Sequence, residues 1–285
     1  MDVRLREARP EDAETCGRIC FRAFHAINTA HNFPPDFPVP EFAIGVLTML
    51  IAHPGFHVVV AERDGQIIGS NAVDERGPIA GIGPITVEPG AQNSGAGGLL
   101  MRYMLERADA RRVPGVRLVQ AAFHNRSLSL YTKLGFDARE PLSCVQGEPM
   151  RVELPGYTVR PATLADVEAC DAVCMRVHGH TRSGELRDAI GAGGATLVEH
   201  AGGVVGYATG IAFFAHAVAD TLTGLQGLIA AAPSYGGPGF LVPTRNAVLL
   251  RWCLAHGLRI VQPLTLMTRG LYSEPAGAYL PSIAY

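Results

Sequence analysis

A run of small residues between an apolar stretch and an amphipathic stretch is the part of the sequence best suited to chemistry. Residues 85–100 read Ile-Thr-Val-Glu-Pro-Gly-Ala-Gln-Asn-Ser-Gly-Ala-Gly-Gly-Leu-Leu. The pattern predicts a strand, a glycine-rich loop and the start of a helix. Small side chains let backbone N–H groups close around an anion, and a helix N-terminus adds unpaired donors and a positive dipole end. We therefore expect a phosphate-bearing ligand here.

Three known phosphate-binding loops differ in where they place glycine and lysine. A Walker loop has lysine directly after its second glycine, but Ala96 follows Gly95, and the helix beyond has no lysine. A dinucleotide-binding loop has the spacing Gly-x-Gly-x-x-Gly, and counting from Gly95 places Leu100 at the third glycine. The spacing that fits is Gln92-x-x-Gly95-x-Gly97.

This spacing resembles the signature of the GNAT superfamily of N-acetyltransferases, Gln/Arg-x-x-Gly-x-Gly/Ala after a strand. Residues 125–136, Asn-Arg-Ser-Leu-Ser-Leu-Tyr-Thr-Lys-Leu-Gly-Phe, are similar to the family's later Asn…Tyr-x-x-x-Gly-Phe helix. With the elements that precede them, these motifs span Val3–Phe136. The resemblance implies an enzyme that takes acetyl-CoA as acyl donor and uses no metal. It would move the acetyl group to a primary amine of a small molecule or peptide, by direct transfer in a ternary complex.

The resemblance also implies roles for individual residues. The strand backbone would hold the pantetheine arm and polarise the thioester carbonyl, as an oxyanion hole does. The loop would wrap the pyrophosphate, and Tyr131 would protonate the departing sulfur. A phenol with a pKa near ~10 suits a thiolate leaving group, although a core tyrosine on an amphipathic helix is the alternative. The expected cofactor-binding residues are Ile85, Thr86, Val87, Gln92, Asn93, Ser94, Gly95, Ala96, Gly97, Gly98, Asn125 and Tyr131.

The general base is less well defined. Glu88, at the end of the strand, is the catalytic candidate, and a solvated strand-end carboxylate is the alternative. His25, His31 and Asp36 lie in the segment 24–40, whose aromatic residues would shape an acceptor pocket or pack a surface loop. The carboxylates of Glu88 and Asp36 favour a cationic amine as acceptor. If a chain of water molecules accepts the proton from the amine, no single residue acts as the base.

The elements around these motifs predict an α/β fold. Each half has an extended segment, two helices and a hairpin, with turns expected at Asp64-Gly65 and Gly202-Gly203. In the first half a strand at Gly81–Val87 leads into the loop and its helix, and a strand at Val116–Ala122 and a helix at Asn125–Leu134 follow. This order implies a central mixed sheet with helices on both faces.

An internal repeat predicts two tandem GNAT-like domains. We expect residues 1–154 to form the catalytic, acetyl-CoA-binding domain and residues 155–285 a degenerate domain with a structural role. The first half carries extra residues, best placed at 24–40. Identical positions lie at an offset of 154 and then of 137, in the pairs Arg6/Arg160, Ala8/Ala162, Asp12/Asp166, Glu14/Glu168, Cys16/Cys170, Cys20/Cys174, Glu62/Glu199, Gly65/Gly202 and Gly69/Gly206.

The second copy departs from the family pattern where the cofactor would bind. After a predicted strand at Gly224–Ala231, residues 232–240 lack the Gln/Arg-x-x-Gly-x-Gly spacing, and Pro238 removes an amide donor. The predicted helix Thr244–His256 has no tyrosine. This half can still border the acceptor site. The terminal carboxylate of Tyr285 is a further candidate base.

Cysteines and histidines raise the question of a metal. Cys16/Cys20 and Cys170/Cys174 each place two thiols one helical turn apart, a spacing that could supply metal ligands. Both pairs fall at positions expected to face the core, where buried cysteines are common. The sequence has no His-x-x-x-His pair on a predicted helix. We therefore expect no metal site.

Composition limits the class of protein. Of 285 residues 48% are hydrophobic, which is sufficient for a packed core, and the net charge of -2 gives no general attraction to nucleic acid or to anionic membranes. No apolar run approaches the ~20 residues of a membrane span, and the N-terminus lacks the apolar core of a signal peptide. We expect a cytoplasmic protein with reduced thiols. The oligomeric state stays open, a homodimer included.

Two other functions compete with catalysis. One is a non-catalytic acyl-CoA-binding sensor, which would keep the loop and lose the chemistry. The other is a scaffold in which neither half binds a cofactor. The intact loop and Tyr131 favour the enzyme, whereas the lack of a defined base does not.

Overall fold

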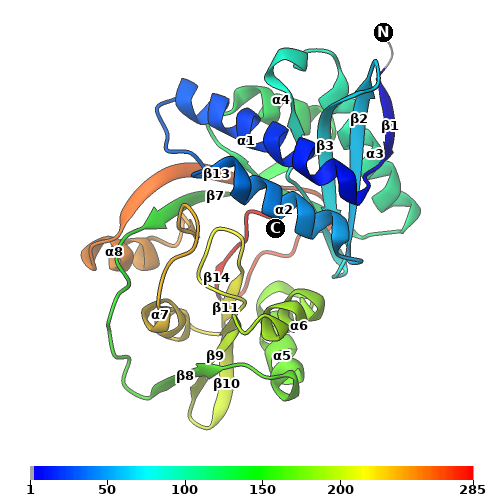
Figure 1. Ribbon diagram of the computed structural model, residues 1–285. Coiled ribbons are helices and arrows are strands. Elements are labelled where there is room, and N and C mark those ends of the chain that lie inside the picture. Colours follow the sequence, from blue (N-terminus) through cyan, green and yellow to red (C-terminus); the bar gives the residue numbers. More distant parts are fainter. Residues whose placement is uncertain (1–2, 285) are drawn as a thin grey trace.

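The computed structural model describes residues 3–284, which form two β-sheets with helices on both faces of each (Figure 1). The first sheet has nine strands in the order β1-β2-β3-β4-β6-β13-β7-β12, with β5 paired to β3. Its β4–β6 pair is parallel and its other pairs are antiparallel, so the mixed sheet predicted from the sequence is confirmed. Its strands are β1 (Arg4–Glu7), β2 (Phe56–Arg63), β3 (Gln66–Asp74), β4 (Ile79–Ile82), β5 (Thr86–Val87), β6 (Gly115–Ala121), β7 (Asp137–Gln146), β12 (Phe240–Pro243) and β13 (Arg259–Gly270).

The second sheet has five antiparallel strands in the order β14-β11-β10-β9-β8. These are β8 (Tyr157–Pro161), β9 (Thr196–His200), β10 (Gly203–Ala208), β11 (Ala217–Ala219) and β14 (Ala278–Leu280). The helices are α1 (Ala13–Ala30), α2 (Pro40–Ala52), α3 (Ala96–Ala110), α4 (Asn125–Lys133), α5 (Val167–His178), α6 (Ser183–Gly191), α7 (Leu222–Ala231) and α8 (Ala247–Ala255), with 3₁₀ turns at Pro10–Asp12, Pro89–Ala91 and Leu164–Asp166.

Alternation of side chains along β2 explains how helices cover both faces of the first sheet. Val59 packs in one core cluster with Leu100 of α3, whereas its neighbour Val60 packs in another with Cys16 and Cys20 of α1. Successive residues of a strand point to opposite faces, so the apolar run in β2 needs a helix on each side. Both cysteines are fully buried, as their helical spacing predicts.

Two matching ion-pair clusters support the predicted duplication. In the first half, Arg6 pairs with Asp12 at 2.6 Å and with Glu62 at 2.7 Å, which joins β1, the first 3₁₀ turn and β2. All three residues belong to the repeat identified in the sequence. The second half forms the same cluster from the repeat-related residues Arg160, Asp166 and Glu199.

The second half contributes strands to the sheet of the first half. After α8 the chain returns to the first sheet, where β13 lies between β6 and β7. In the register, Leu264 of β13 is opposite Ala121 of β6 and Leu142 of β7. β12 extends the same sheet beyond β7. The second half therefore completes the sheet that carries the first half's motifs, and the two sheets do not divide the chain at residue 155.

The strand predicted at Gly224–Ala231 is wrong, because this segment is helix α7. The Thr221 hydroxyl accepts a hydrogen bond from the Gly224 amide and caps the helix. Leu225 and Leu228 are buried and lie three residues apart, as on one face of a helix. In the sequence, a short apolar run of this kind is equally compatible with a buried strand. Only Asp220 and Thr221 separate β11 from α7, so the second half has a short turn where the first half has its glycine-rich loop.

Two smaller features also differ from expectation. The strand predicted at Gly81–Val87 is broken into β4 and β5 at Gly83-Pro84, where proline has no N–H to donate. The first hairpin turns at Asp64-Gly65 as predicted, with φ of 53° and 75°. The second turns at Ala201-Gly202, one residue earlier than predicted, with φ of 50° and 82°.

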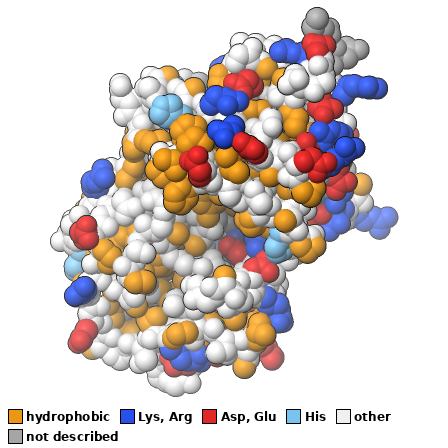
Figure 2. Space-filling view, in the orientation of Figure 1, with side chains coloured by type: hydrophobic (Ala, Val, Ile, Leu, Met, Phe, Trp, Pro, Cys, Tyr) orange, Lys and Arg blue, Asp and Glu red, His pale blue; other side chains and the backbone are white. Residues whose placement is uncertain are grey.

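The surface of the first half carries mixed charge. Figure 2 shows acidic and basic side chains interspersed over the upper part of the molecule, with apolar side chains between them. No helix within residues 3–284 combines the length and apolar character needed to cross a bilayer.

Acidification should destabilise the protein through two buried histidines, His178 and His216, whose Nε2 atoms lie 3.1 Å apart. Burial, assisted by the charge of Arg182, holds the pKa of each well below 6.5. Below pH 6.5 the unfolded chain therefore binds protons that the folded protein does not, and stability falls with falling pH. The expected loss is about 1.4 kcal/mol per pH unit for each histidine.

Urea unfolding near pH 7.5, 6 and 5 checks this expectation. The double variant His178→Gln/His216→Gln should lose less stability than the wild type between pH 6 and 5. The control is His256→Gln, at an exposed site on the end of α8. Equal pH slopes for the wild type and the double variant would show that the buried pair does not control acid stability.

Candidate active site

Two adjoining cavities lie at the C-terminal end of β5. The first, the loop cavity, has a volume of about 240 Å³ and is bordered by the glycine-rich loop and α4. The second, the inner cavity, has a volume of about 140 Å³ and lies between α1 and the strands β5, β6 and β13. Six residues line both cavities, so a ligand that extends from one cavity into the other must pass them. The shared residues are Ile85, Val87, Gln92, His124, Ser127 and Tyr131.

The glycine-rich loop is shaped to present its backbone amides. Asn93 and Gly95 adopt positive φ of 68° and 85°, and α3 begins at Ala96. The first amides of a helix have no acceptor within the helix, and the dipole places partial positive charge at this end. A Cβ atom added at Gly95 would meet no atom within 4 Å, so the space over the loop is open. Gln92 and residues 93–98 line the loop cavity.

Arg126 adds a cation that the sequence analysis did not identify. Its guanidinium donates to Gln92 Oε1 and to Asn93 Oδ1, both at 2.9 Å, and Arg126 lines the loop cavity. Guanidinium groups suit phosphate recognition because several N–H donors lie in one plane. The only signal in the sequence was its place beside Asn125 in the later motif.

Strand β5 offers one free edge to the cavities. It pairs with β3, with Thr86 opposite Ser70, whereas β6 pairs with β4 only at residues 79–81. Beyond Ile82 the strands β5 and β6 separate, and Ile85–Val87 line the space between them. Among the described residues, β5 has no second strand partner. This edge is where the sequence predicts that the pantetheine arm lies.

Tyr131 lies at the junction of the two cavities. It is buried at 6% exposure and packs edge-on against Phe136, with ring centroids 6.2 Å apart. Burial raises the pKa of Tyr131 to about 12, and a hydrogen bond with the Ser127 hydroxyl acts in the opposite direction. The phenol therefore stays protonated across the physiological pH range and can act as a proton donor.

His124 was also missed from the sequence. Its Nδ1 lies 2.5 Å from Ser127 Oγ, and it lines both cavities. Burial, followed by the charges of Arg126 and His31, lowers the pKa of His124, so the ring is neutral at pH 7. Because the Ser127 hydroxyl also lowers the pKa of Tyr131, the three residues give a polar group at the junction of the cavities.

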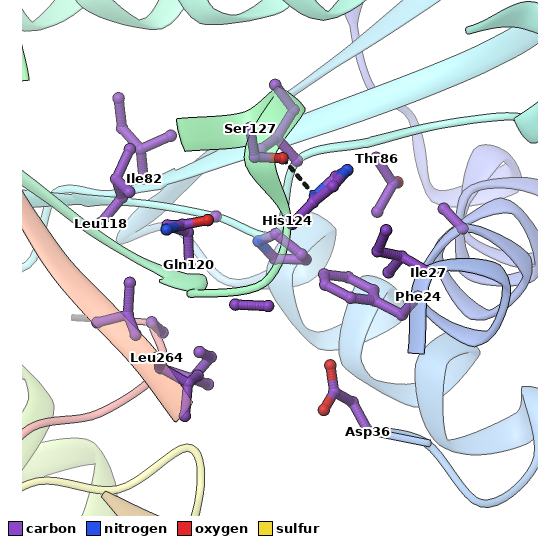
Figure 3. A pocket seen from close by; sticks show the side chains of 18 of the residues that line it. Phe24, Ile27, Asp36, Ile82, Thr86, Leu118, Gln120, His124, Ser127 and Leu264 are labelled. Atoms are coloured by element: carbon purple, nitrogen blue, oxygen red, sulfur yellow. Dashed lines mark hydrogen bonds between the residues drawn. The ribbon is translucent and has the colours of Figure 1, made fainter. Parts of the chain in front are cut away.

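Asp36 is the predicted acceptor residue that the structure places in the inner cavity (Figure 3). Gln262 of β13 donates from Nε2 to Asp36 Oδ1 at 2.8 Å. Burial raises the pKa of Asp36 above its ordinary value, partly offset by hydrogen bonds from Gln262 and Asn28. A carboxylate with a raised pKa is a better proton acceptor than an exposed one.

The other sequence candidates lie elsewhere. Glu88 is engaged by Arg22 at 2.5 Å and lines neither cavity. His25 stacks on Phe21, and His31 packs against Phe123 with its Nδ1 near the Ile27 carbonyl. Asn125 begins α4 and is not among the residues that line the cavities. Tyr285 lies outside the described residues. Within residues 3–284, no group of three or more acidic, histidine or cysteine side chains is placed to hold a metal ion.

Comparison with known proteins agrees with this fold. Residues 22–136 match the model of the acetyltransferase (GNAT) family. This segment contains the C-terminal half of α1, both halves of the split strand, the loop and α4. The match identifies a GNAT acetyltransferase domain within the first half of the chain. No curated protein sequence matches the chain.

Solved structures show the same architecture over almost the whole chain. A protein described as an acetyltransferase from Pyrococcus horikoshii is 18% identical, with a TM-score of 0.73 over 96% of this chain and 91% of that one. A GCN5-related N-acetyltransferase from Sphaerobacter thermophilus is 16% identical, with a TM-score of 0.62 over 95% and 96%. A tandem GNAT protein from the clavulanic acid biosynthesis pathway is 14% identical, with a TM-score of 0.56 over 94% and 98%. At these identities the likeness establishes the fold.

Proposed function

We propose that the protein transfers an acetyl group from acetyl-CoA to a primary amine, directly and within a ternary complex. The observation that carries the proposal is the continuity of the two cavities at Tyr131 and β5. The loop cavity exposes backbone amides and the guanidinium of Arg126, which suit a pyrophosphate. The inner cavity is largely apolar and contains the carboxylate of Asp36, which suits an amine. The thioester of a donor bound in the loop cavity would lie at their junction.

Each chemical requirement of the reaction has a matching group. The free edge of β5 offers backbone N–H groups that would polarise the thioester carbonyl. The amine nitrogen forms a bond to the carbonyl carbon and loses a proton to Asp36, which takes the role that the sequence analysis gave to Glu88. As the C–S bond breaks, Tyr131 gives its proton to the thiolate. Ser127, hydrogen-bonded to Tyr131, is placed to return a proton to the phenolate.

The cysteines support direct transfer over an acetyl-enzyme intermediate. All six are buried free thiols, and none of them lines either cavity within the described chain. Burial raises the pKa of every one, which disfavours the thiolate that attack on a thioester requires.

The test is a thiol-release assay combined with mass spectrometry. The protein is incubated with acetyl-CoA and a mixture of primary amines, and free CoA and acetylated amine are quantified together. We expect equal amounts of both products and no acetylated protein by intact mass. Acetyl-CoA binding without amine-dependent release of CoA would instead support an acyl-CoA sensor. An acetylated protein that forms before product would overturn direct transfer.

A further inference from the structure

The inner cavity is walled by apolar side chains from both halves of the chain. The segment 24–40 provides one side, and residues of the second half close the other (Figure 3). Its volume of about 140 Å³ is close to that of an engineered apolar cavity that holds benzene, ~150 Å³. The space therefore suits a body of about one aromatic ring. Its apolar walls include Phe24, Ile27, Phe37, Leu118, Phe213, Phe214 and Leu264.

The described residues that line this cavity supply one charged group, a carboxylate. Among the described residues that line it, Asp36 is the only acidic side chain, and none is lysine or arginine. One ammonium group can be paired there, whereas a second would be taken out of water without a partner. Burying an unpaired charge is strongly unfavourable. The cavity therefore disfavours polyamines and aminoglycoside-like acceptors, which carry several amines.

Gln120 indicates that the acceptor also has a polar group. This residue of β6 is 5% exposed, and neither atom of its side-chain amide has a hydrogen-bond partner among the described residues. Figure 3 shows Gln120 on the strand side of the cavity, across from Asp36 on the α1 side. A buried amide without partners costs roughly 1–3 kcal/mol, so a ligand that supplies a donor or acceptor here gains affinity and specificity.

We infer that the acceptor is a primary amine on a ring-sized apolar body with one hydrogen-bonding group, its ammonium held by Asp36 and its polar group by Gln120. This inference rests on the proposed acetyl transfer. In the reaction the ammonium first gives one proton to Asp36, which frees the lone pair of the nitrogen to form the N–C bond. The C–S bond then breaks with protonation of the sulfur by Tyr131, and the second proton that the nitrogen loses replaces the one given by the phenol. Gln120 sets which ring substituent is accepted.

Four probe amines separate the alternatives. Tyramine has the ring, the amine and a hydroxyl, and phenethylamine lacks only the hydroxyl. Spermidine carries several amines on a chain, and an alanyl dipeptide amide represents a peptide N-terminus. We expect kcat/KM for tyramine to exceed that for spermidine and for the dipeptide by at least about 100-fold. It should exceed that for phenethylamine by about 10-fold, the usual effect of one buried hydrogen bond.

Variants then assign the two polar contacts. Asp36→Asn should lower kcat/KM for tyramine by at least about 100-fold and leave the Kd for acetyl-CoA within twofold of the wild type. Gln120→Leu should abolish the preference for tyramine over phenethylamine while activity on phenethylamine persists. Asp64→Asn, in the exposed first hairpin turn, makes the same chemical change as Asp36→Asn away from both cavities and should have no effect.

The outcomes distinguish this inference from the proposed function. If no amine stimulates release of CoA, the proposed function fails, and the acceptor assignment fails with it. If amines are acetylated but spermidine or the dipeptide is preferred, acetyl transfer stands and the acceptor class is wrong. Retention of the tyramine preference in Gln120→Leu would remove Gln120 from acceptor recognition.

Discussion

Replacing Tyr131 with phenylalanine should lower kcat for acetyl transfer by about 10²–10⁴-fold, the usual contribution of a general acid. The affinity for acetyl-CoA should not change, because the ring that lines both cavities is retained. The loss arises because the thiolate must then leave without a proton donor. Burial raises the pKa of Tyr131 to about 12, so the wild-type phenol should remain a donor up to strongly alkaline pH.

Steady-state kinetics and acetyl-CoA titration of the same protein samples check this prediction. The matched control is Tyr103→Phe on α3, which removes a phenol hydroxyl that lies 3.3 Å from His57 Nε2 and outside both cavities. The control should keep wild-type kcat. Equal turnover for Tyr131→Phe and the wild type at every pH would eliminate Tyr131 as the acid.

Replacing Gly95 with aspartate should weaken acetyl-CoA binding by roughly 30- to 1000-fold. The side chain would project into open space over the loop, where the pyrophosphate is expected. A carboxylate a few ångströms from a phosphate costs about 2–4 kcal/mol at the effective dielectric of a protein surface. The fold should survive, because aspartate tolerates positive φ better than most residues.

Two further variants separate charge from backbone effects. Gly95→Asn has the same shape and the same tolerance of positive φ without the charge, so it should bind acetyl-CoA far better than Gly95→Asp. Gly90→Asp introduces the same charge in the neighbouring 3₁₀ turn, where a Cβ also meets no atom, and Gly90 does not line the loop cavity. If Gly90→Asp weakened binding as much as Gly95→Asp, a general electrostatic effect would replace the loop assignment.

The sequence predicted local features well, because local spacing carries their physics. Glycines at fixed intervals after a strand identified the loop, and Asp64-Gly65 identified a hairpin turn that the structure confirms. The repeat was visible because its matched residues, Arg6 among them, form the same ion-pair cluster in both halves. These features depend on neighbours in sequence or on pairs of recognisable type.

Long-range pairing could not be predicted in this way. Nothing in the residues of β13 indicates that it inserts between β6 and β7, because any apolar strand of suitable length would pair equally well. The placement of Gln262 beside Asp36 depends on that insertion, so the polar environment of Asp36 was not predictable. Gln120 gave only a weak signal, a polar residue within a buried strand. The apolar run of α7 was ambiguous because a short apolar helix and a buried strand share a composition.

A calorimetric titration of the wild-type protein with acetyl-CoA would test directly whether the loop cavity binds the donor. We predict binding at one site per chain, with a roughly micromolar Kd, because among the described residues the glycine-rich loop occurs in the first half alone. Absence of binding, or two equivalent sites per chain, would contradict the assignment of the loop cavity to acetyl-CoA.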